Sequence, residues 1–308
     1  MTPLALQFFG HVPEGHRILE VGPSYSPMFS KSSGRPVSVL DHATRDELIA
    51  KYSNDPGADH TRIEEVDFVW RRGPMSEALP PCERGTFDIM VASHVVEHTP
   101  DLVSFLVSAQ EILRPSGRFL LVVPDKRFCF DYFRPPSTTG DVLNAHLACR
   151  SRHTPGTIFD QLAYSVSTDG RVAWSQEPMG VLKLEHDLAT TRTQLTPPGE
   201  EAPYRDAHNW RFTPAWFQLI ILELAWLGLA DWRADRVGET HHCEFPVQLS
   251  RGGTAWARSF APHQLQEMRL GLLRATLLEQ RAQVDWWLAG NPSCGLLPSQ
   301  GHETRTAS

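Results

Sequence analysis

The 308-residue sequence contains few cysteines, and none of the five forms a C-x-x-C pair. A disulfide framework and a zinc site built from cysteines are therefore both unexpected, since the number is odd and the spacing is wide. Free thiols persist in a reducing compartment, so we expect a cytoplasmic protein. The five residues are Cys82, Cys129, Cys149, Cys243 and Cys294.

An excess of basic charge and a long apolar run are also lacking. The formal net charge is -7 at pH 7, whereas a surface that coats nucleic acid needs clustered lysine and arginine. The longest apolar stretch, residues 217–230, is interrupted by Gln218 and Glu223 and is too short to span a bilayer. The N-terminus lacks the basic and apolar regions of a signal peptide. We predict no nucleic-acid partner and no membrane span.

Short apolar runs alternate with helical segments over the first part of the chain. Nearly continuous apolar runs are typical of strands buried on both faces of a parallel sheet. Thr44 begins a capping box, and Thr99-Pro100 is expected to open an amphipathic helix. The alternation predicts an α/β fold with a doubly wound, mostly parallel sheet. The predicted strands are residues 17–21, 37–40, 65–69, 86–92 and 118–123.

Later segments of the chain are expected to complete the sheet and cover it. A buried helix is predicted from Thr213-Pro214 to Leu227, followed by two strands at 231–237 and 244–249. These strands bring the sheet to seven, with an antiparallel last strand. An amphipathic helix over 262–288 and a disordered tail after Gly290 follow. The predicted division is 1–125 for the Rossmann-like core, 126–210 for an insertion or substrate lid rich in proline and glycine, 211–252 for the last core helix and hairpin, and 253–308 for the C-terminal helix and tail.

Small and acidic residues follow the first three predicted strands. Strand one runs into residues 20–24 (EVGPS), where small residues let the backbone approach a ligand closely. The loop lacks the three-glycine spacing of a dinucleotide fingerprint and does not define a site by itself. Asp41 ends strand two, where an acid can accept hydrogen bonds from both hydroxyls of a ribose or can cap a helix. Asp67, at strand three, could meet an adenine or be a solvated charge.

Three segments together resemble the class I S-adenosylmethionine-dependent methyltransferase superfamily, most of all its ubiquinone and menaquinone C-methyltransferase branch. They are residues 18–23 (ILEVGP), 87–98 (FDIMVASHVVEH) and 112–119 (ILRPSGRF). The family also ends its sheet with an antiparallel hairpin, which the strands at 231–237 and 244–249 fit. A nicotinamide-binding fold has no such requirement.

The resemblance implies S-adenosyl-L-methionine as the cofactor and assigns residues to its parts. Ser24 and Ser26 depart from the pattern, because the family usually has glycine there. The residues that the resemblance assigns are Glu20, Gly22, Pro23 and Ser24 for the methionine end, Asp41 with His42 for the ribose, Asp67 and Phe68 for the adenine, and Ser93, His94 and His98 for the far side of the cofactor.

The resemblance predicts methyl transfer to a small-molecule or sugar-containing acceptor by in-line displacement. The cofactor carries the activated leaving group, so the protein mainly supplies alignment. A hydroxyl or protonated amine acceptor also needs a base. We favour His208, which precedes the capped helix start, and next Asp125, which leaves strand five. The full set of candidates is Asp125, Lys126, Asp131, His146, His186 and His208.

Two further features of the sequence leave alternatives open. His94 and His98 are four residues apart, but without an H-E-x-x-H arrangement we predict no metal site and expect them to pack or to line the pocket. The apolar residues of the last helix either pack on the core or form a homodimer contact.

Two other functions are alternatives to the methyltransferase. A scaffold that keeps the fold without catalysis would explain the serines in the first loop, and a nicotinamide dehydrogenase is the third reading. Binding of S-adenosylhomocysteine separates the methyltransferase from the scaffold, and the dehydrogenase predicts binding of NAD instead.

Overall fold

The computed structural model describes residues 3–177, 180–195 and 204–290. The tail predicted after Gly290 lies outside these ranges, as does the proline-glycine segment at 197–199. Within the described ranges, no helix combines the length and apolar character needed to cross a membrane.

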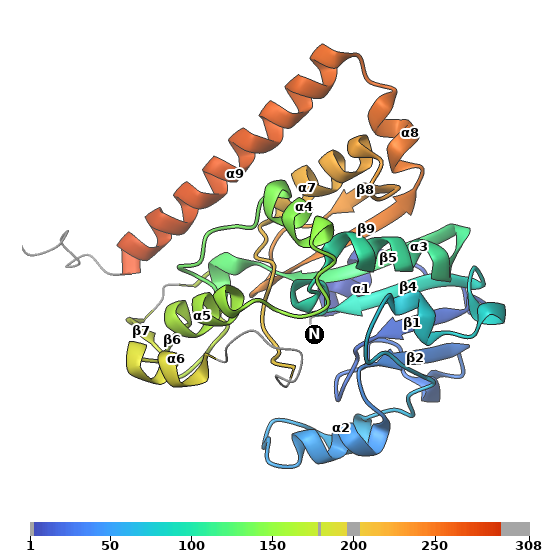
Figure 1. Ribbon diagram of the computed structural model, residues 1–308, viewed down its shortest axis with the longest axis horizontal. Coiled ribbons are helices and arrows are strands. Elements are labelled where there is room, and N and C mark those ends of the chain that lie inside the picture. Colours follow the sequence, from blue (N-terminus) through green and yellow to red (C-terminus); the bar gives the residue numbers. More distant parts are fainter. Residues whose placement is uncertain (1–2, 178–179, 196–203, 291–308) are drawn as a thin grey trace, which may run out of the picture.

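The central element is a seven-stranded sheet with the order β3-β2-β1-β4-β5-β9-β8 (Figure 1). Strands β1 to β5 are parallel, β9 runs antiparallel to β5, and β8 pairs antiparallel with β9. The predicted fold class is therefore confirmed, including the terminal hairpin. The strands are β1 (Ile18–Val21), β2 (Val37–Asp41), β3 (Phe68–Val69), β4 (Phe87–Ser93), β5 (Leu113–Pro124), β8 (Trp232–Val237) and β9 (Glu244–Arg251).

Side chains of the central strands alternate between two buried layers, because successive residues of a strand point to opposite faces. Leu121 and Val123 of β5 join the core beneath α3 (Leu102–Ile112) and α7 (Pro214–Leu227). Leu120 and Val122 join the second core, on which α1 (Pro3–Phe9) lies. Both faces of the sheet are thus covered, as the continuous apolar runs predict.

Some element boundaries differ from the prediction. Strand β3 has two residues instead of the five predicted, since only Phe68 and Val69 pair with β2. Helix α3 begins at Leu102 and is capped by the Asp101 carboxylate, which accepts a hydrogen bond from the Ser104 amide, rather than by Thr99. The capping box at Thr44 is confirmed at the start of α2 (Arg45–Tyr52).

The insertion after β5 consists of short elements, as its proline and glycine content predicts. Beside β5 and the α3 side of the sheet lie η6 (Lys126–Phe128) and α4 (Thr139–Leu147); α5, β6, β7 and α6 lie further out (Figure 1). The bounds of these four are α5 (Pro155–Tyr164), β6 (Val166–Thr168), β7 (Leu182–Leu184) and α6 (Leu188–Gln194).

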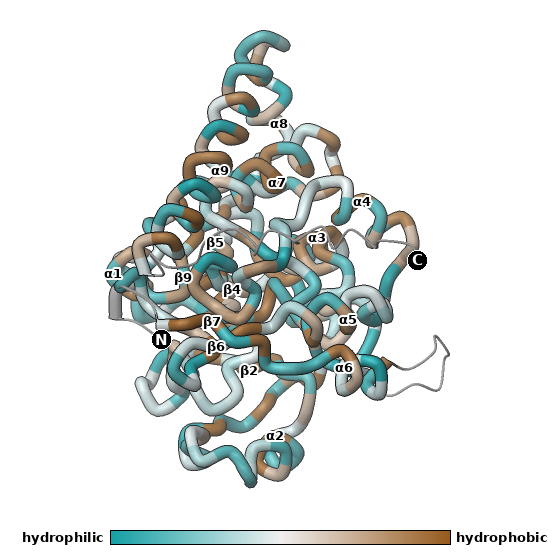
Figure 2. Tube along the Cα trace, turned by 90° about the vertical axis from the view of Figure 1, so that its left-hand side faces the viewer, coloured by the Kyte–Doolittle hydropathy of each residue, from teal (hydrophilic) through white to brown (hydrophobic). Residues whose placement is uncertain are grey.

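Two helices, α8 (Gly253–Arg258) and α9 (Pro262–Gly290), follow the sheet. The first turns of α9 pack against α7 and α8 through Leu265 and Met268. Its last turns reach the insertion, where the Trp286 ring lies 5.6 Å from that of Phe128. Helix α9 alternates hydrophilic and hydrophobic residues along its length (Figure 2). It therefore joins the last core helix to the insertion.

Candidate functional site

A large open cleft of about 1990 Å³ lies at the carboxyl ends of β1, β2 and β4. Strand β1 stands between β2 and β4, so the strand order reverses there, and ligands of doubly wound sheets bind at such a switch point. The loops after these strands and the end of the insertion line the cleft. The lining residues relevant here are Glu20, Gly22, Pro23, Ser24, Asp41, His42, Trp70, Ser93, His94, His98, His146, Tyr204, Asp206 and Glu244.

The turn after β1 depends on close packing at Gly22. Its φ is +63°, and a Cβ placed on it would lie 2.8 Å from Cγ2 of Val95 in the loop after β4. Its amide donates to the carbonyl oxygen of Leu40 at 2.8 Å. Glycine is therefore needed here both for the backbone conformation and for the contact between the two loops. Ser24 has a φ of +49°, a conformation that favours glycine, at a position where the resembled family usually has it.

The two predicted acids at the ends of β1 and β2 hold this turn. The Glu20 carboxylate accepts hydrogen bonds from the amides of Met28 and Phe29 at 2.5 and 2.9 Å. Burial raises the pKa of Glu20 to about 7, although these two amides act to lower it. Asp41 accepts from the His42 amide and lies 2.6 Å from the His42 ring nitrogen Nδ1. Both acids are nearly inaccessible, yet both border the cleft.

One polar atom of the turn is left for a ligand. The Ser24 hydroxyl oxygen is buried and has no hydrogen-bond partner among the described residues. Ser24 nevertheless lines the cleft. A buried hydroxyl without a partner costs free energy, so a polar group bound at this point would satisfy it.

The predicted adenine-flanking residues lie behind the cleft wall. Asp67 accepts a hydrogen bond from the Val39 amide at 2.7 Å and pairs with Lys31 at 2.7 Å. Phe68 packs against the core. Neither is among the described residues that line the cleft. Trp70, just past β3, does line it, and its ring stacks on that of Phe105 at 6.3 Å. Trp70 was not among the predicted site residues. Its position directly after strand three is the sequence signal that could have identified it.

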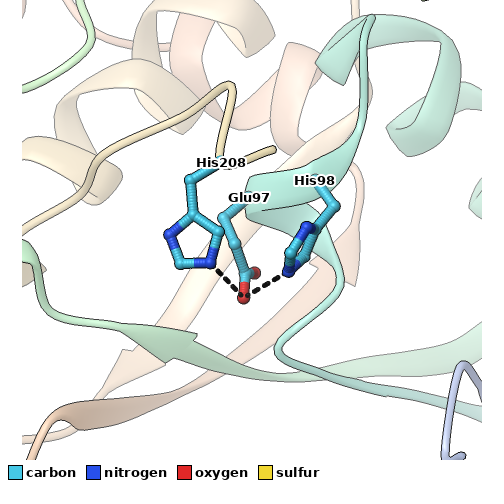
Figure 3. A group of neighbouring side chains, drawn as sticks. All are labelled: Glu97, His98 and His208. Atoms are coloured by element: carbon cyan, nitrogen blue, oxygen red, sulfur yellow. Dashed lines mark ion pairs between the residues drawn. The ribbon is translucent and has the colours of Figure 1, made fainter. Parts of the chain in front are cut away.

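A cluster of histidines surrounds a buried carboxylate after β4 (Figure 3). Glu97 is fully buried, and neither of its oxygens accepts a hydrogen bond from any residue in the described ranges. Its Oε1 lies 3.6 Å from His98 Nε2, 3.9 Å from His208 Nε2 and 3.7 Å from His94 Nδ1. Glu97 was not among the predicted site residues, and its only signal in the sequence is its position between His94 and His98.

Carboxylates also hold the outer nitrogens of these histidines. His98 Nδ1 lies 2.9 Å from Asp206, and His208 Nδ1 lies 2.5 Å from Asp131. Asp131 is paired on its other oxygen with Arg134 at 2.5 Å, and Arg134 donates to the His208 carbonyl oxygen. Burial acts to raise the pKa of Asp131, but His208 and Arg134 outweigh it and hold this pKa at about 2.

Two of the histidines that border the cleft, His94 and His98, have raised pKa values. Burial alone would lower the pKa of His98, but Asp206 and Glu97 more than offset it. Burial likewise acts to lower the pKa of His94. The hydrogen bond between His94 and Glu244, at 2.8 Å, and the nearby Glu97 charge outweigh this effect and raise the pKa.

The two predicted bases, His208 and Asp125, lie in different surroundings. It brings His208 to Glu97 and His98, with the His98 ring edge-on at 4.6 Å between centroids, but His208 itself does not line the cleft. Asp125 is fully buried, and its oxygens are bound by Arg127 and by the Thr240 hydroxyl at 2.6 Å. Asp125 is therefore not brought to the cleft.

The other candidates are also dispersed. His146 lines the cleft and lies 2.9 Å from Asp101. Lys126 donates hydrogen bonds to the Tyr132 carbonyl oxygen and to the Gln283 side chain of α9. These two bonds join the insertion to α9. Neither Lys126 nor His186 belongs to the cleft lining within the described residues.

A doubly wound sheet with a glycine turn after β1, an acid ending β2 and an open cleft at the switch point defines a Rossmann-like α/β protein. Residues 3–170 match the family model described as a methyltransferase domain, which is more than half of the chain. The protein therefore belongs to the methyltransferase domain family.

Matches to individual proteins are more distant. A segment of 133 residues is 29% identical to part of the highly reducing polyketide synthase sorA of Penicillium rubens, covering 39% of this chain and 5% of that protein. A solved DhpI–SAH complex is 17% identical, with 81% of this chain and 83% of that chain covered and a TM-score of 0.40. The CcbJ methyltransferase of Streptomyces caelestis is 13% identical, with 80% and 93% covered and a TM-score of 0.40. At these values the family assignment rests on the domain match alone.

Proposed function

We propose that the protein is an S-adenosylmethionine-dependent methyltransferase that acts on a small-molecule or sugar-containing acceptor. The observation that carries this proposal is the convergence of the Gly22–Ser24 turn and Asp41 on one cleft, with the Ser24 hydroxyl unpaired. Membership of the methyltransferase domain family supports the reaction class.

The residues of the cleft fit the parts of such a cofactor. Glu20, Gly22, Pro23 and Ser24 would hold the methionine end, where the unpaired hydroxyl meets a charged carboxylate or ammonium group. Asp41, with His42, would accept the ribose hydroxyls. Trp70 would cover the adenine in place of Phe68, with Asp67 holding the strands behind it. Ser93 and the two histidines after β4 would border the sulfonium side.

The acceptor would occupy the part of the cleft nearest the insertion. His98, Thr99, Asp101, Tyr204 and Asp206 line this part, so it offers polar partners for hydroxyl groups. In the transfer, a lone pair of the acceptor forms a bond to the methyl carbon while the carbon–sulfur bond breaks and its electrons stay on sulfur. The described part of the insertion, within 126–210, would act as the wall that aligns the acceptor.

Proton removal would pass through the histidine cluster. His208 does not line the cleft, whereas His98 does and lies next to it, with 4.6 Å between the ring centroids. We propose that His208 acts through Glu97 and His98 and that Asp125 holds the insertion through Arg127 and Thr240. The resemblance to the ubiquinone and menaquinone branch and a cytoplasmic, biosynthetic role remain parts of the same proposal.

Calorimetry with S-adenosylhomocysteine tests this function. We expect saturable binding of S-adenosylhomocysteine and none of NAD. A folded protein that binds neither would favour the scaffold, and binding of NAD alone would favour a dehydrogenase. Mass spectrometry of a cell extract incubated with the protein and a methyl-labelled cofactor would then identify the acceptor and its methylated atom.

A further inference from the structure

The buried carboxylate of Glu97 faces three imidazole rings but accepts no hydrogen bond from the described residues. Both of its oxygens lack a hydrogen-bond partner in the described ranges, and its side chain is fully buried. A buried polar group without a hydrogen-bond partner costs about 1–3 kcal/mol, and more when it is charged. The surrounding imidazole nitrogens lie 3.6 to 3.9 Å away, beyond hydrogen-bond distance. A group placed between Glu97 and these rings would give Glu97 Oε1 a partner.

The spacing of the cluster matches that of metal ligands. One ligand atom each from Glu97, His98 and His208 all lie within 4.8 Å of one another. Tetrahedral zinc with bonds near 2.0–2.1 Å places its ligand atoms about 3.4 Å apart. The observed distances from Glu97 Oε1 to the two Nε2 atoms are 3.6 and 3.9 Å, so a small contraction would complete the site. In Figure 3 both rings point toward the same carboxylate.

The outer partners of the two histidines have the arrangement that metal sites need. A histidine that binds a metal usually donates its other ring N–H to a carboxylate or a carbonyl, which fixes the tautomer and the orientation of the ring. Asp206 holds Nδ1 of His98, and Asp131 holds Nδ1 of His208. Each Nε2 is thereby left to face Glu97. His94 also has a carboxylate, Glu244, on one ring nitrogen, and its Nδ1 lies 3.7 Å from Glu97 Oε1. It does not belong to the group of ligand atoms that all lie within 4.8 Å of one another.

We propose that Glu97, His98 and His208 bind one divalent transition-metal cation of the Zn²⁺ class. Two imidazoles and one carboxylate leave a coordination position open. Because His98 lines the cleft, the cation would lie in the wall of the acceptor region. The binding stands on the cluster alone, whereas its use in methyl transfer rests on the function proposed above.

The cation would select acceptors that present a hydroxyl oxygen. A hydroxyl bound to the cation would lose its proton near neutral pH. This proton would pass to water in the open cleft instead of to the histidine cluster, because the cation would occupy the nitrogens that face Glu97. The resulting oxygen anion then forms the carbon–oxygen bond as the carbon–sulfur bond breaks, with the electron pair remaining on sulfur. The product is a methyl ether and the thioether form of the cofactor.

The test uses tag-free, full-length protein freed of metal with a chelator. Zn²⁺ is titrated by calorimetry and Co²⁺ by its visible absorption, and we expect about one equivalent of each with the absorption of a tetrahedral site. Glu97→Gln and His208→Gln should each weaken binding more than about 100-fold, and Asp206→Asn by about 10–100-fold. His146→Gln is the matched control, since His146 also pairs with a carboxylate but lies outside the cluster. Its metal affinity should equal that of the wild type.

The outcomes separate this site from the cofactor site. S-adenosylhomocysteine binding is measured on every variant and should persist in Glu97→Gln. A wild-type protein that binds S-adenosylhomocysteine but neither metal overturns the metal site and leaves the proposed function standing. Metal binding that survives in both Glu97→Gln and His208→Gln also overturns it. If Glu97→Gln fails to fold, the metal affinities of Asp206→Asn and His208→Gln test the site, and wild-type affinity in both would overturn it.

Discussion

The backbone amide of Ser24 donates a hydrogen bond of 3.3 Å to Oδ2 of Asp41. This contact joins the turn after β1 to the end of β2, so the two elements that border the cleft are fixed relative to each other. The other carboxylate oxygen of Asp41 holds the amide of His42. The acid is therefore oriented before any ligand arrives, which reduces the entropy cost of binding.

Replacement of Asp41 by alanine should weaken the binding of S-adenosylhomocysteine. The ribose hydroxyls would lose a charged acceptor, which corresponds to about 1–3 kcal/mol. Calorimetry measures the change, and Asp41→Asn, which keeps one carbonyl oxygen, should fall between the wild type and Asp41→Ala. Asp46→Ala on the exposed side of α2 makes the same change of charge away from the cleft and should leave the affinity unaltered. Equal affinity of Asp41→Ala and the wild type would remove Asp41 from the site.

Replacement of Gly22 by alanine should abolish cofactor binding. The new Cβ would lie 2.8 Å from Val95, and the left-handed backbone adds about 1–2 kcal/mol of strain. Gly85→Ala is the matched control, because Gly85 has a φ of +70° and no atom within 4 Å of an added Cβ. Both variants should lose stability in urea unfolding, but only Gly22→Ala should lose S-adenosylhomocysteine affinity. Loss of affinity in Gly85→Ala as well would point to a general loss of stability instead.

The parts of the fold that local chemistry determines were predictable. The apolar runs placed the strands, and the hydroxyl–acid spacing at Thr44 placed the start of α2. The short helices α1 and α8 were not predicted, because short helices are marginal without tertiary packing. Ala5 and Phe9 of α1, for example, are buried on the sheet. Strand β3 was predicted too long, since its pairing with β2 stops after two residues.

The proposed cofactor side of the cleft was more predictable than the proposed acceptor side. Glu20, Gly22 and Asp41 lie at strand ends, and the topology alone brings such positions together. The environment of Glu97 depends instead on His208, Asp131 and Asp206, which arrive from the distant insertion. No local pattern states that a carboxylate will be buried without a partner, so its role required the folded structure.

The predicted homodimer contact lies on helix α9. Leu277 and Leu278 on this helix are 64% and 66% exposed, whereas Leu265 and Leu272 pack on α7 and α8. If the exposed leucines form the contact, Leu277→Glu should convert a dimer to a monomer in sedimentation equilibrium, since a buried charge opposes association. Leu184→Glu on β7 adds the same charge at a similarly exposed leucine and should leave the assembly unchanged. A monomeric wild-type protein would show the prediction to be wrong.

Lys126 should make the stability of the protein depend on alkaline pH. Its side chain is 4% exposed, and burial lowers its pKa from 10.5 to about 8. Between these two pH values the unfolded chain binds a proton that the folded chain does not, so the free energy of unfolding rises with pH across this window. The rise is on the order of 3 kcal/mol for a shift of this size. Below pH 8 the penalty of the buried charge is fully present.

Urea unfolding of the wild type and of Lys126→Met across the window from pH 8 to pH 10.5 measures this contribution. The free energy of unfolding of the wild type, minus that of Lys126→Met, should grow as the pH rises, because only the wild type gains from losing the proton. Lys126→Met also loses the hydrogen bonds to Tyr132 and Gln283, which lowers its stability by a similar amount at every pH. The exposed Lys183→Met variant should follow the wild type throughout. A constant difference between wild type and Lys126→Met would mean that Lys126 titrates alike in the folded and unfolded chains, and that its ammonium group is solvated where α9 meets the insertion.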